Sequence, residues 1–79
     1  MTNDKNENAF NTLVGGYIKL HRMAMKMTQT DLSKRCGISR TTLAQIEIGR
    51  QGITAWQLKK ISSALRVTIG RLIPTGWIE

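Results

Sequence analysis

The chain has 79 residues, and a domain of this size buries only about 60% of its unfolded surface, which disfavours a large substrate cavity. Twelve Lys and Arg against five Asp and Glu give a net charge of +7 and a pI near 10.4, so we expect a polyanionic partner. Hydrophobic residues make up 41% of the chain, too many for a disordered basic tail, and no apolar run is long enough to span a membrane.

The positive charge is concentrated in the middle of the chain. Residues 1–8 carry two acids and one base, and residues 74–79 carry a single acid, so each end has a net charge of −1. Residues 9–73 therefore hold eleven bases against Asp31 and Glu47, a net charge of +9. The polar opening segment is not expected to be a signal peptide. The single Cys36 excludes an internal disulfide, which fits a cytoplasmic protein.

The first predicted element is a helix preceded by an arm. Residues 1–8 are polar and rich in Asn, so we expect them to be flexible. Apolar residues then follow at helical spacing, and the helix is expected to end at residues 25–26. Gly15 and Gly16 interrupt the pattern, each at a cost of about 1 kcal/mol relative to Ala. The helix is therefore expected to begin either near Phe10 or after the glycine pair.

Two short helices joined by a three-residue turn come next, over residues 29–36 and 40–48. Each follows a residue whose hydroxyl can cap the first turn, and each ends before a glycine that can adopt a left-handed conformation. The capping residues are Thr28 and Ser39, and the closing glycines are Gly37 and Gly49. Asp31 completes a capping box with Thr28. Two helices joined by a short turn with Gly are typical of a helix-turn-helix.

Two further helices complete the expected fold. Thr54 can cap a fourth helix over residues 55–65, and Thr68 can cap a short fifth helix over residues 69–73. The apolar side of the fourth helix is expected to consist of Trp56, Leu58, Ile61, Ala64 and Leu65. Because no strand pattern or repeat is evident, the sequence predicts an all-α domain of five helices.

We expect that domain to occupy residues 9–73, between the arm and a short tail over residues 74–79. The core is expected to receive Ile38 from the turn and Leu43 and Ile46 from the helix over residues 40–48. Its opposite face is polar or small and consists of Arg40, Thr41, Ala44 and Gln45. A helix with such a face can enter the major groove of DNA, which is about 12 Å wide, and read base edges.

A longer pattern makes this interpretation specific. The chain carries Gln29-x3-Ser33-x3-Gly37-Ile38-Ser39-x3-Leu43-x2-Ile46-Glu47-x-Gly49-Arg50 and then Ile53-Thr54-x3-Leu58-x2-Ile61-x2-Ala64-Leu65-x-Val67-Thr68-x3-Leu72. Together these runs resemble the Cro and phage-repressor type of helix-turn-helix, the Xre family. The resemblance covers about residues 13–73 and implies a lambda repressor-like DNA-binding domain.

The resemblance also implies roles for individual residues. The positions that match base-reading residues are Arg40, Thr41, Ala44 and Gln45, and those that match DNA-backbone contacts are Gln29, Ser39, Thr42 and Arg50. Arg22 and Glu47 resemble a buried ion pair that ties the first helix to the end of the third. Chemically, Arg pairs well with guanine, Gln pairs with adenine, and a Thr methyl packs on thymine.

Three positions depart from the family pattern. Lys26 and Arg66 stand where a Gly is usual, and Ile48 is apolar where a polar residue is usual. None of them belongs to the base-reading face, so they bear on loop geometry more than on function. Among the other basic residues, Lys34 and Arg35 are equally well explained by contact with DNA phosphates and by simple exposure to solvent.

These features predict a sequence-specific regulator of transcription, a repressor, that binds double-stranded DNA at a pseudo-palindromic operator as a homodimer. A Trp and an Ile on a short tail are expected to be buried, either against the core of their own domain or against a second subunit. We favour the second arrangement, with a dimer interface that consists of Ile69, Leu72, Ile73, Trp77 and Ile78. Two alternatives stay open. One is an antitoxin that binds a toxin and represses its own promoter, and the other is a restriction–modification controller protein.

Other classes of function have little support. A single His, with no carboxylate pair and no phosphate-binding glycine loop, disfavours an enzyme. His21 and Cys36 are too few for a metal site, and no cofactor is expected. Met23, Met25 and Met27 are assigned to packing. Membrane-surface binding is disfavoured because the Lys and Arg residues are dispersed over all the expected helices.

Overall fold

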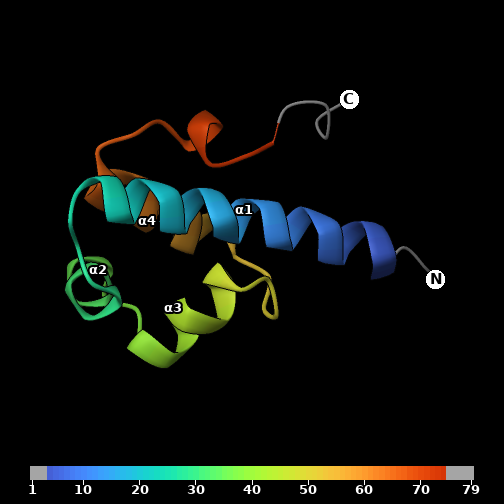
Figure 1. Cartoon of the computed structure of the whole chain (residues 1–79), viewed down its shortest axis with the longest axis horizontal. Helices are drawn as coiled ribbons and strands as arrows, with labels where there is room; N and C mark the ends of the chain where they lie inside the picture. The colour runs from blue at the N-terminus through green and yellow to red at the C-terminus, as the bar shows by residue number, and fades with distance from the viewer. Residues whose placement is uncertain (1–3, 75–79) are drawn as a thin grey trace.

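The computed structural model of the chain describes residues 4–74. Within that range it contains four α-helices, one 3-10 helix and no strand, so the all-α class is confirmed and the expected fifth helix is a single 3-10 turn. The elements are α1 (Asp4–Ala24), α2 (Gln29–Cys36), α3 (Arg40–Glu47), α4 (Ala55–Leu65) and η1 (Ile69–Arg71). Figure 1 shows α1 lying across the molecule, with α4 behind it and α2 and α3 below it.

The first helix is longer than the sequence predicts. It begins at Asp4 instead of near Phe10, so residues 4–8 are helical where a flexible arm is expected. The composition predicts an arm, but an acidic residue near a helix N-terminus, such as Glu7, favours a helix because it complements the helix dipole. The helix also continues through Gly15 and Gly16 without a break.

Two glycines let α1 approach the end of α3 closely. A Cβ at Gly15 would clash with the carbonyl oxygens of Ile46 and Glu47, and a Cβ at Gly49 would lie 2.7 Å from the Cα of Thr12. Gly49 also has a φ of +81°, which L side chains rarely adopt. This contact explains why α1 keeps a glycine that weakens the helix when considered alone.

The local signals of the helix-turn-helix are confirmed. The hydroxyl of Thr28 accepts a hydrogen bond from the Asp31 N–H, and the Asp31 carboxylate accepts one from the Thr28 N–H, both at 3.0 Å. Gly37 closes α2 with a φ of +69°. The hydroxyl of Ser39 accepts a hydrogen bond from the Thr42 N–H at 3.0 Å and so caps α3, which ends one residue earlier than predicted.

Lys26 and Arg66, which occupy usual Gly positions, both adopt left-handed conformations with φ near +57° and +59°. Arg66 closes α4, and Lys26 lies in the turn between α1 and α2. A left-handed conformation costs a residue with a Cβ about 1 kcal/mol. Both turns therefore keep the shape that a Gly would give them, with a side chain added.

The fourth helix begins as predicted, but Trp56 does not face the core. It is 65% exposed, and the Nζ atoms of Lys59 and Lys60 lie 6.0 and 5.3 Å from its ring centroid. Trp56 precedes the fully buried Ile61 by five residues, which places it well round the helix from the buried side. Thr68 makes no side-chain cap, in keeping with the short η1.

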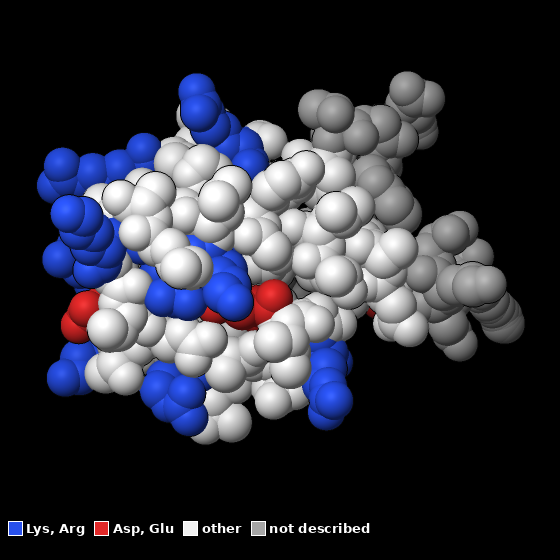
Figure 2. Space-filling model, viewed as in Figure 1, with Lys and Arg blue, Asp and Glu red and all other residues white. Residues whose placement is uncertain are grey.

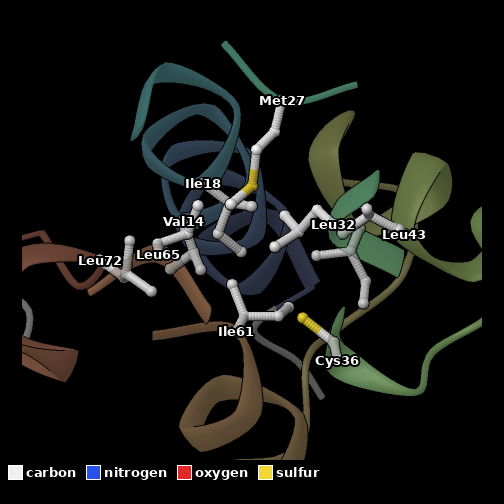
Figure 3. Packing of buried hydrophobic residues seen from close by; sticks show 10 residues of the cluster. Val14, Ile18, Met27, Leu32, Cys36, Leu43, Ile61, Leu65 and Leu72 are labelled. Carbon is white, nitrogen blue, oxygen red and sulfur yellow. The ribbon is translucent and has the colours of Figure 1, made fainter. Parts of the chain in front are cut away.

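The core forms where the four α-helices meet (Figure 3). Its members are Val14, Ile18, Met27, Leu32, Cys36, Leu43, Ile46, Ile61, Leu65 and Leu72. Of the three methionines assigned to packing, only Met27 is buried, whereas Met23 and Met25 are exposed. Among residues 4–74, no helix is both long enough and apolar enough to cross a membrane.

Candidate nucleic-acid interface

The third helix presents a polar face directed away from the core. On its inner side, Leu43 and Ile46 are buried. The outer face consists of the exposed Arg40 and Thr41 and the half-buried Ala44 and Gln45. These positions are separated by one, three, four and five residues, so they lie together along one side of the helix. The structure therefore brings the four predicted base-reading residues onto one surface.

A shallow hollow lies beside the N-terminus of α2, next to the start of α3. It is lined by Arg22, Met23, Lys26, Met27, Thr28, Gln29, Thr30 and Arg40. The first amides of a helix have no intrahelical partners and carry partial positive charge. With the basic side chains beside it, this end of α2 favours an anion such as a phosphate group.

An ion pair lies behind the hollow and joins α1 to α3. Arg22 donates from Nε to Glu47 Oε2 at 2.7 Å and from Nη2 to Glu47 Oε1 at 3.0 Å. Its Nη1 donates to the carbonyl of Met27 at 2.7 Å, which also fixes the turn before α2. The side chains of Arg22 and Glu47 are 10% and 1% exposed. The ion pair that the resemblance implies is thus present and buried.

Gln29 connects this ion pair to the outer face of α3. Its Nε2 donates to Glu47 Oε1 at 3.0 Å, and its Oε1 accepts from Arg40 Nη1 at 3.2 Å. The sequence predicts a DNA-backbone contact for Gln29 but not its bond to Glu47. One signal could have indicated this bond. A carboxylate has about four acceptor sites, Arg22 fills two of those on Glu47, and a buried carboxylate needs its acceptors satisfied.

The predicted backbone-contacting residues border the same face. Besides capping α3, the Ser39 hydroxyl donates to Thr42 Oγ1 at 2.9 Å. Ser39 is exposed and Thr42 is half-buried. Arg50 is exposed just beyond α3, where its backbone N–H donates to the Gln45 carbonyl at 3.0 Å. Ser39 and Thr42 thus lie at the start of α3, and Arg50 lies at its end.

The electrostatics of this region favour an anionic partner. Figure 2 shows Lys and Arg side chains gathered at the end of the molecule where α2 lies and along the edge where α3 lies. In α2, the backbone N–H and hydroxyl of Thr28 lower the pKa of the Asp31 carboxyl, and Arg35 and Lys34 lower it further. Asp31 therefore stays ionised as part of the helix cap, and Lys34 and Arg35 are exposed beside it.

The cysteine has no sign of a reactive setting. Cys36 is buried, and its thiol lies 3.8 Å from the carbonyl of Lys60, to which it donates. Burial raises the pKa of the Cys36 thiol, although Lys60 opposes this effect, so the thiol stays protonated at neutral pH. In the described part of the chain, no three His, Cys, Asp or Glu residues gather as metal ligands would.

The residues expected at a dimer interface differ in their exposure to solvent. Ile69 is 39% exposed and Ile73 is half-buried, so both reach the surface. Leu72 is fully buried in the core of its own chain, which corrects its assignment to an interface, since its side chain cannot face a second copy. Trp77 and Ile78 lie outside the described residues.

Solved structures of several proteins share this fold. The restriction-modification controller protein C.AhdI from Aeromonas hydrophila is similar with a TM-score of 0.80 and 22% identity, over 82% of this chain and 98% of that chain. The hypothetical transcription factor NHTF from Neisseria is similar with a TM-score of 0.79 and 25% identity, over 86% and 78%. The clp gene regulator ClgR from C. glutamicum is similar with a TM-score of 0.76 and 19% identity, over 80% and 82%.

No curated protein sequence matches this chain. The helix-turn-helix family HTH_3, however, matches residues 18–72, which run from the last third of α1 to the residue after η1 and include all of α2 and α3. The chain belongs to the Xre/Cro-like helix-turn-helix family.

Proposed function

We propose that this protein regulates transcription by binding double-stranded DNA in a sequence-specific manner, with α3 in the major groove. The observation that carries the proposal is the polar face of α3, which lies next to a basic hollow at the N-terminus of α2. A groove about 12 Å wide admits an α-helix, and the flanking phosphates then lie near the ends of the two motif helices.

Base readout falls to the outer face of α3. Arg40 can donate two hydrogen bonds to guanine, and Gln45 can donate to and accept from adenine. Thr41 and Ala44 can pack their methyl groups on thymine. The phosphate contacts fall to Gln29, Ser39, Thr42 and Arg50, and the net charge of +9 on residues 9–73 supplies the general attraction.

A dimer and a repressor role complete the proposal. One copy offers a single short recognition helix, and two copies related by a two-fold axis would present two such helices about 34 Å apart. Ile69 and Ile73 reach the surface, and in the sequence they precede the tail that carries Trp77 and Ile78. A pseudo-palindromic operator matches this symmetry, and occupation of a promoter by such a dimer represses it.

A restriction–modification controller is the second candidate function. The similarity to C.AhdI favours it, because nearly the whole length of that chain is matched by this one. At 22% identity this similarity supports a shared fold and not a shared function. The genes next to this one would distinguish a controller from another regulator, because a controller lies beside restriction and modification genes. No observation on residues 4–74 favours the antitoxin alternative.

Selection from a random double-stranded library, followed by footprinting on the DNA upstream of the gene, tests the proposal. We expect a two-fold related site whose affinity falls steeply with salt. Arg40→Ala and Gln45→Ala should each cost about 1–3 kcal/mol of binding free energy and relax preference at one or two base positions. Arg71→Ala, which removes an exposed base on η1, is the control. If Arg40→Ala and Gln45→Ala bind the selected site like the wild type, α3 is not the recognition helix.

A further inference from the structure

The first helix carries apolar residues on the side that faces solvent as well as on the side that faces the core. Leu13, Leu20 and Met23 are 41%, 62% and 57% exposed. In Figure 1 no described element lies in front of α1. With the small exposed residues between and beside them, they form an uncharged band that we call the α1 stripe: Ala9, Leu13, Gly16, Leu20, Met23 and Ala24. Exposed apolar residues that are contiguous, unlike isolated ones, indicate an interaction surface.

The spacing of the α1 stripe indicates that its partner is a helix. From Ala9 to Met23 its residues follow one another at intervals of four, three, four and three positions. This is the period at which two helices pack side by side along a seam. Val14 and Ile18, which are buried in the core, lie on a different side of α1. The helix therefore has one apolar side for its own domain and a second one for another helix.

Gly16 lies at the middle of the α1 stripe, and no contact in the described part of the chain requires a glycine there. A Cβ at Gly16 would meet nothing within 4 Å, whereas a Cβ at Gly15 would clash with the backbone of α3. A Gly inside a helix destabilises it relative to Ala. The packing of one chain explains Gly15 but not Gly16. Because the side chains at a contact set the distance between two helices, Gly16 allows a second helix to approach α1 closely.

The α1 stripe is symmetric about its middle. Leu13 and Leu20 are equally far from the midpoint between residues 16 and 17, and so are Ala9 and Ala24. An interface between identical subunits related by a two-fold axis must be self-complementary in this way. Two antiparallel copies of α1 that meet at this midpoint place Leu13 of each chain against Leu20 of the other. The absence of charge in the stripe also suits a second copy, because each chain has a net charge of +7.

We propose that the α1 stripe binds the α1 stripe of a second copy of this chain in an antiparallel arrangement, and that this contact joins two DNA-bound molecules. The first part depends on the stripe alone, and the second part rests on the proposed function. The contact differs from that of the proposed operator-binding dimer, whose residues lie toward the C-terminal end of the chain.

The position of the α1 stripe relative to α3 supports the second part. At 100° per residue, the stripe lies about 140° round α1 from Gly15 and Arg22, and these two residues face α3. When two copies are joined through the stripe, their α3 helices therefore lie on the far sides of the pair. This arrangement suits two separate segments of DNA.

Sedimentation equilibrium of the full chain, from about 10 µM to about 1 mM, tests the contact. A helix pair over residues 9–24 is only about 24 Å long, and small interfaces bind weakly. Leu13→Glu and Leu20→Lys each place a charge against an apolar side chain when identical chains pair. Each substitution alone should lower the average mass at the highest concentration about twofold relative to the wild type. Lys19→Glu, at an exposed position of α1 outside the stripe, is the control and should not lower the mass.

An equal mixture of the two variants tests the antiparallel arrangement. The new acid of one chain then lies opposite the new base of the other, and the two unaltered leucines still meet, so the mixture should recover the wild-type mass. Thermal melting confirms that each variant is folded, as expected for exposed positions. A mixture that keeps the mass of the separate variants would overturn the arrangement. The contact itself would be overturned if both variants associate like the wild type, or if association is lost only when residues 75–79 are removed.

A second measurement tests whether the contact joins DNA. A duplex with the selected site is fixed to a surface and loaded with protein, and the capture of a second, labelled duplex is recorded. The wild type and the mixture should capture it, whereas each variant alone should capture about tenfold less while binding one duplex as tightly as the wild type. Association in solution without capture would overturn the joining of DNA. A wild type that binds no DNA would overturn the proposed function, and the sedimentation result would still decide the contact.

Discussion

The α2–α3 unit and the first helix are held in place by interactions of different range. The boundaries of α2 and the start of α3 depend on contacts within a few residues, such as the bonds between Thr28 and Asp31 and the left-handed Gly37. The position of α1 depends on contacts with α3 between residues more than twenty positions apart, namely the close approach of Gly15 and the ion pair of Arg22. Short-range interactions therefore define the motif, and long-range interactions attach it to the domain.

This difference has a consequence for the polar face of α3. Gly15 packs against the C-terminal end of α3, and the same end carries Glu47, which is paired with Arg22. The attachment of α1 is therefore coupled to the side chains behind Arg40. Substitutions in α1 should disturb the whole domain, whereas substitutions at the caps of α2 should have smaller and more local effects.

The largest expected effect follows from breaking the ion pair. Arg22→Met should lower the free energy of unfolding by about 3–5 kcal/mol, because Glu47 would remain buried without its partner charge. Urea denaturation followed by circular dichroism measures the change. Arg71→Met, at an exposed position on η1, is the control and should change stability by less than about 0.5 kcal/mol. A loss below about 1 kcal/mol for Arg22→Met would mean that the pair does not hold α1 on α3.

A pair of adjacent glycines tests the close contact of the two helices. Gly15→Ala should destabilise the domain by about 2–3 kcal/mol, because its methyl group would meet the backbone of α3. Gly16→Ala should stabilise it by about 0.5–1 kcal/mol, because that position lies in a helix and faces open space. The same urea titration compares the two variants. Changes of the same sign would show that α1 does not approach α3 as closely as the structure indicates.

The ends of a helix can be predicted from the sequence where the residues that determine them are neighbours in the sequence. Thr28, Asp31 and Thr54 identify the starts of α2 and α4 correctly, because the capping partners lie three residues away. The length of α1 could not be predicted in this way. Gly15 weakens a helix when considered alone, and only its contact with α3 explains why the helix continues through it.

The candidate site also combines features that a local sequence pattern predicts with features that depend on contacts between distant residues. The face of α3 could be predicted, because helical periodicity alone places Arg40 and Gln45 on one side. The bond between Gln29 and Glu47 joins residues eighteen positions apart, and no local pattern indicates it. The prediction that Trp56 faces the core is wrong, because its angular position on α4 turns this hydrophobic side chain away from the buried side. The prediction that Leu72 lies at an interface is wrong as well, because Leu72 is buried in the core of its own chain.

The two left-handed residues give a smaller effect with a defined sign. Lys26→Gly and Arg66→Gly should each raise the free energy of unfolding by about 0.5–1 kcal/mol. Gly adopts a positive φ without strain, which stabilises the folded chain. The greater freedom of Gly in the unfolded chain offsets only part of this gain. Lys19→Gly, at an exposed position inside α1, is the matched control and should lower stability by about 1 kcal/mol. A loss of stability in Lys26→Gly would mean that its side chain makes a contact that outweighs the strain.

The smallest expected effect concerns the cap of α2 and its dependence on pH. Hydrogen bonds from Thr28 lower the pKa of Asp31 in the folded chain below its ordinary value of 3.8. A lowered folded pKa means that ionised Asp31 stabilises the fold above pH 3.8 and that this contribution is lost as the pH falls through the folded pKa. Asp31→Asn should therefore melt below the wild type at pH 7, and the difference should shrink toward pH 2. A difference that stays constant with pH would contradict this account.

An NMR titration of the Asp31 carboxyl gives the folded pKa directly. Because its partners lie within four residues of it, the lowered pKa should persist in Gly15→Ala for as long as α2 is folded.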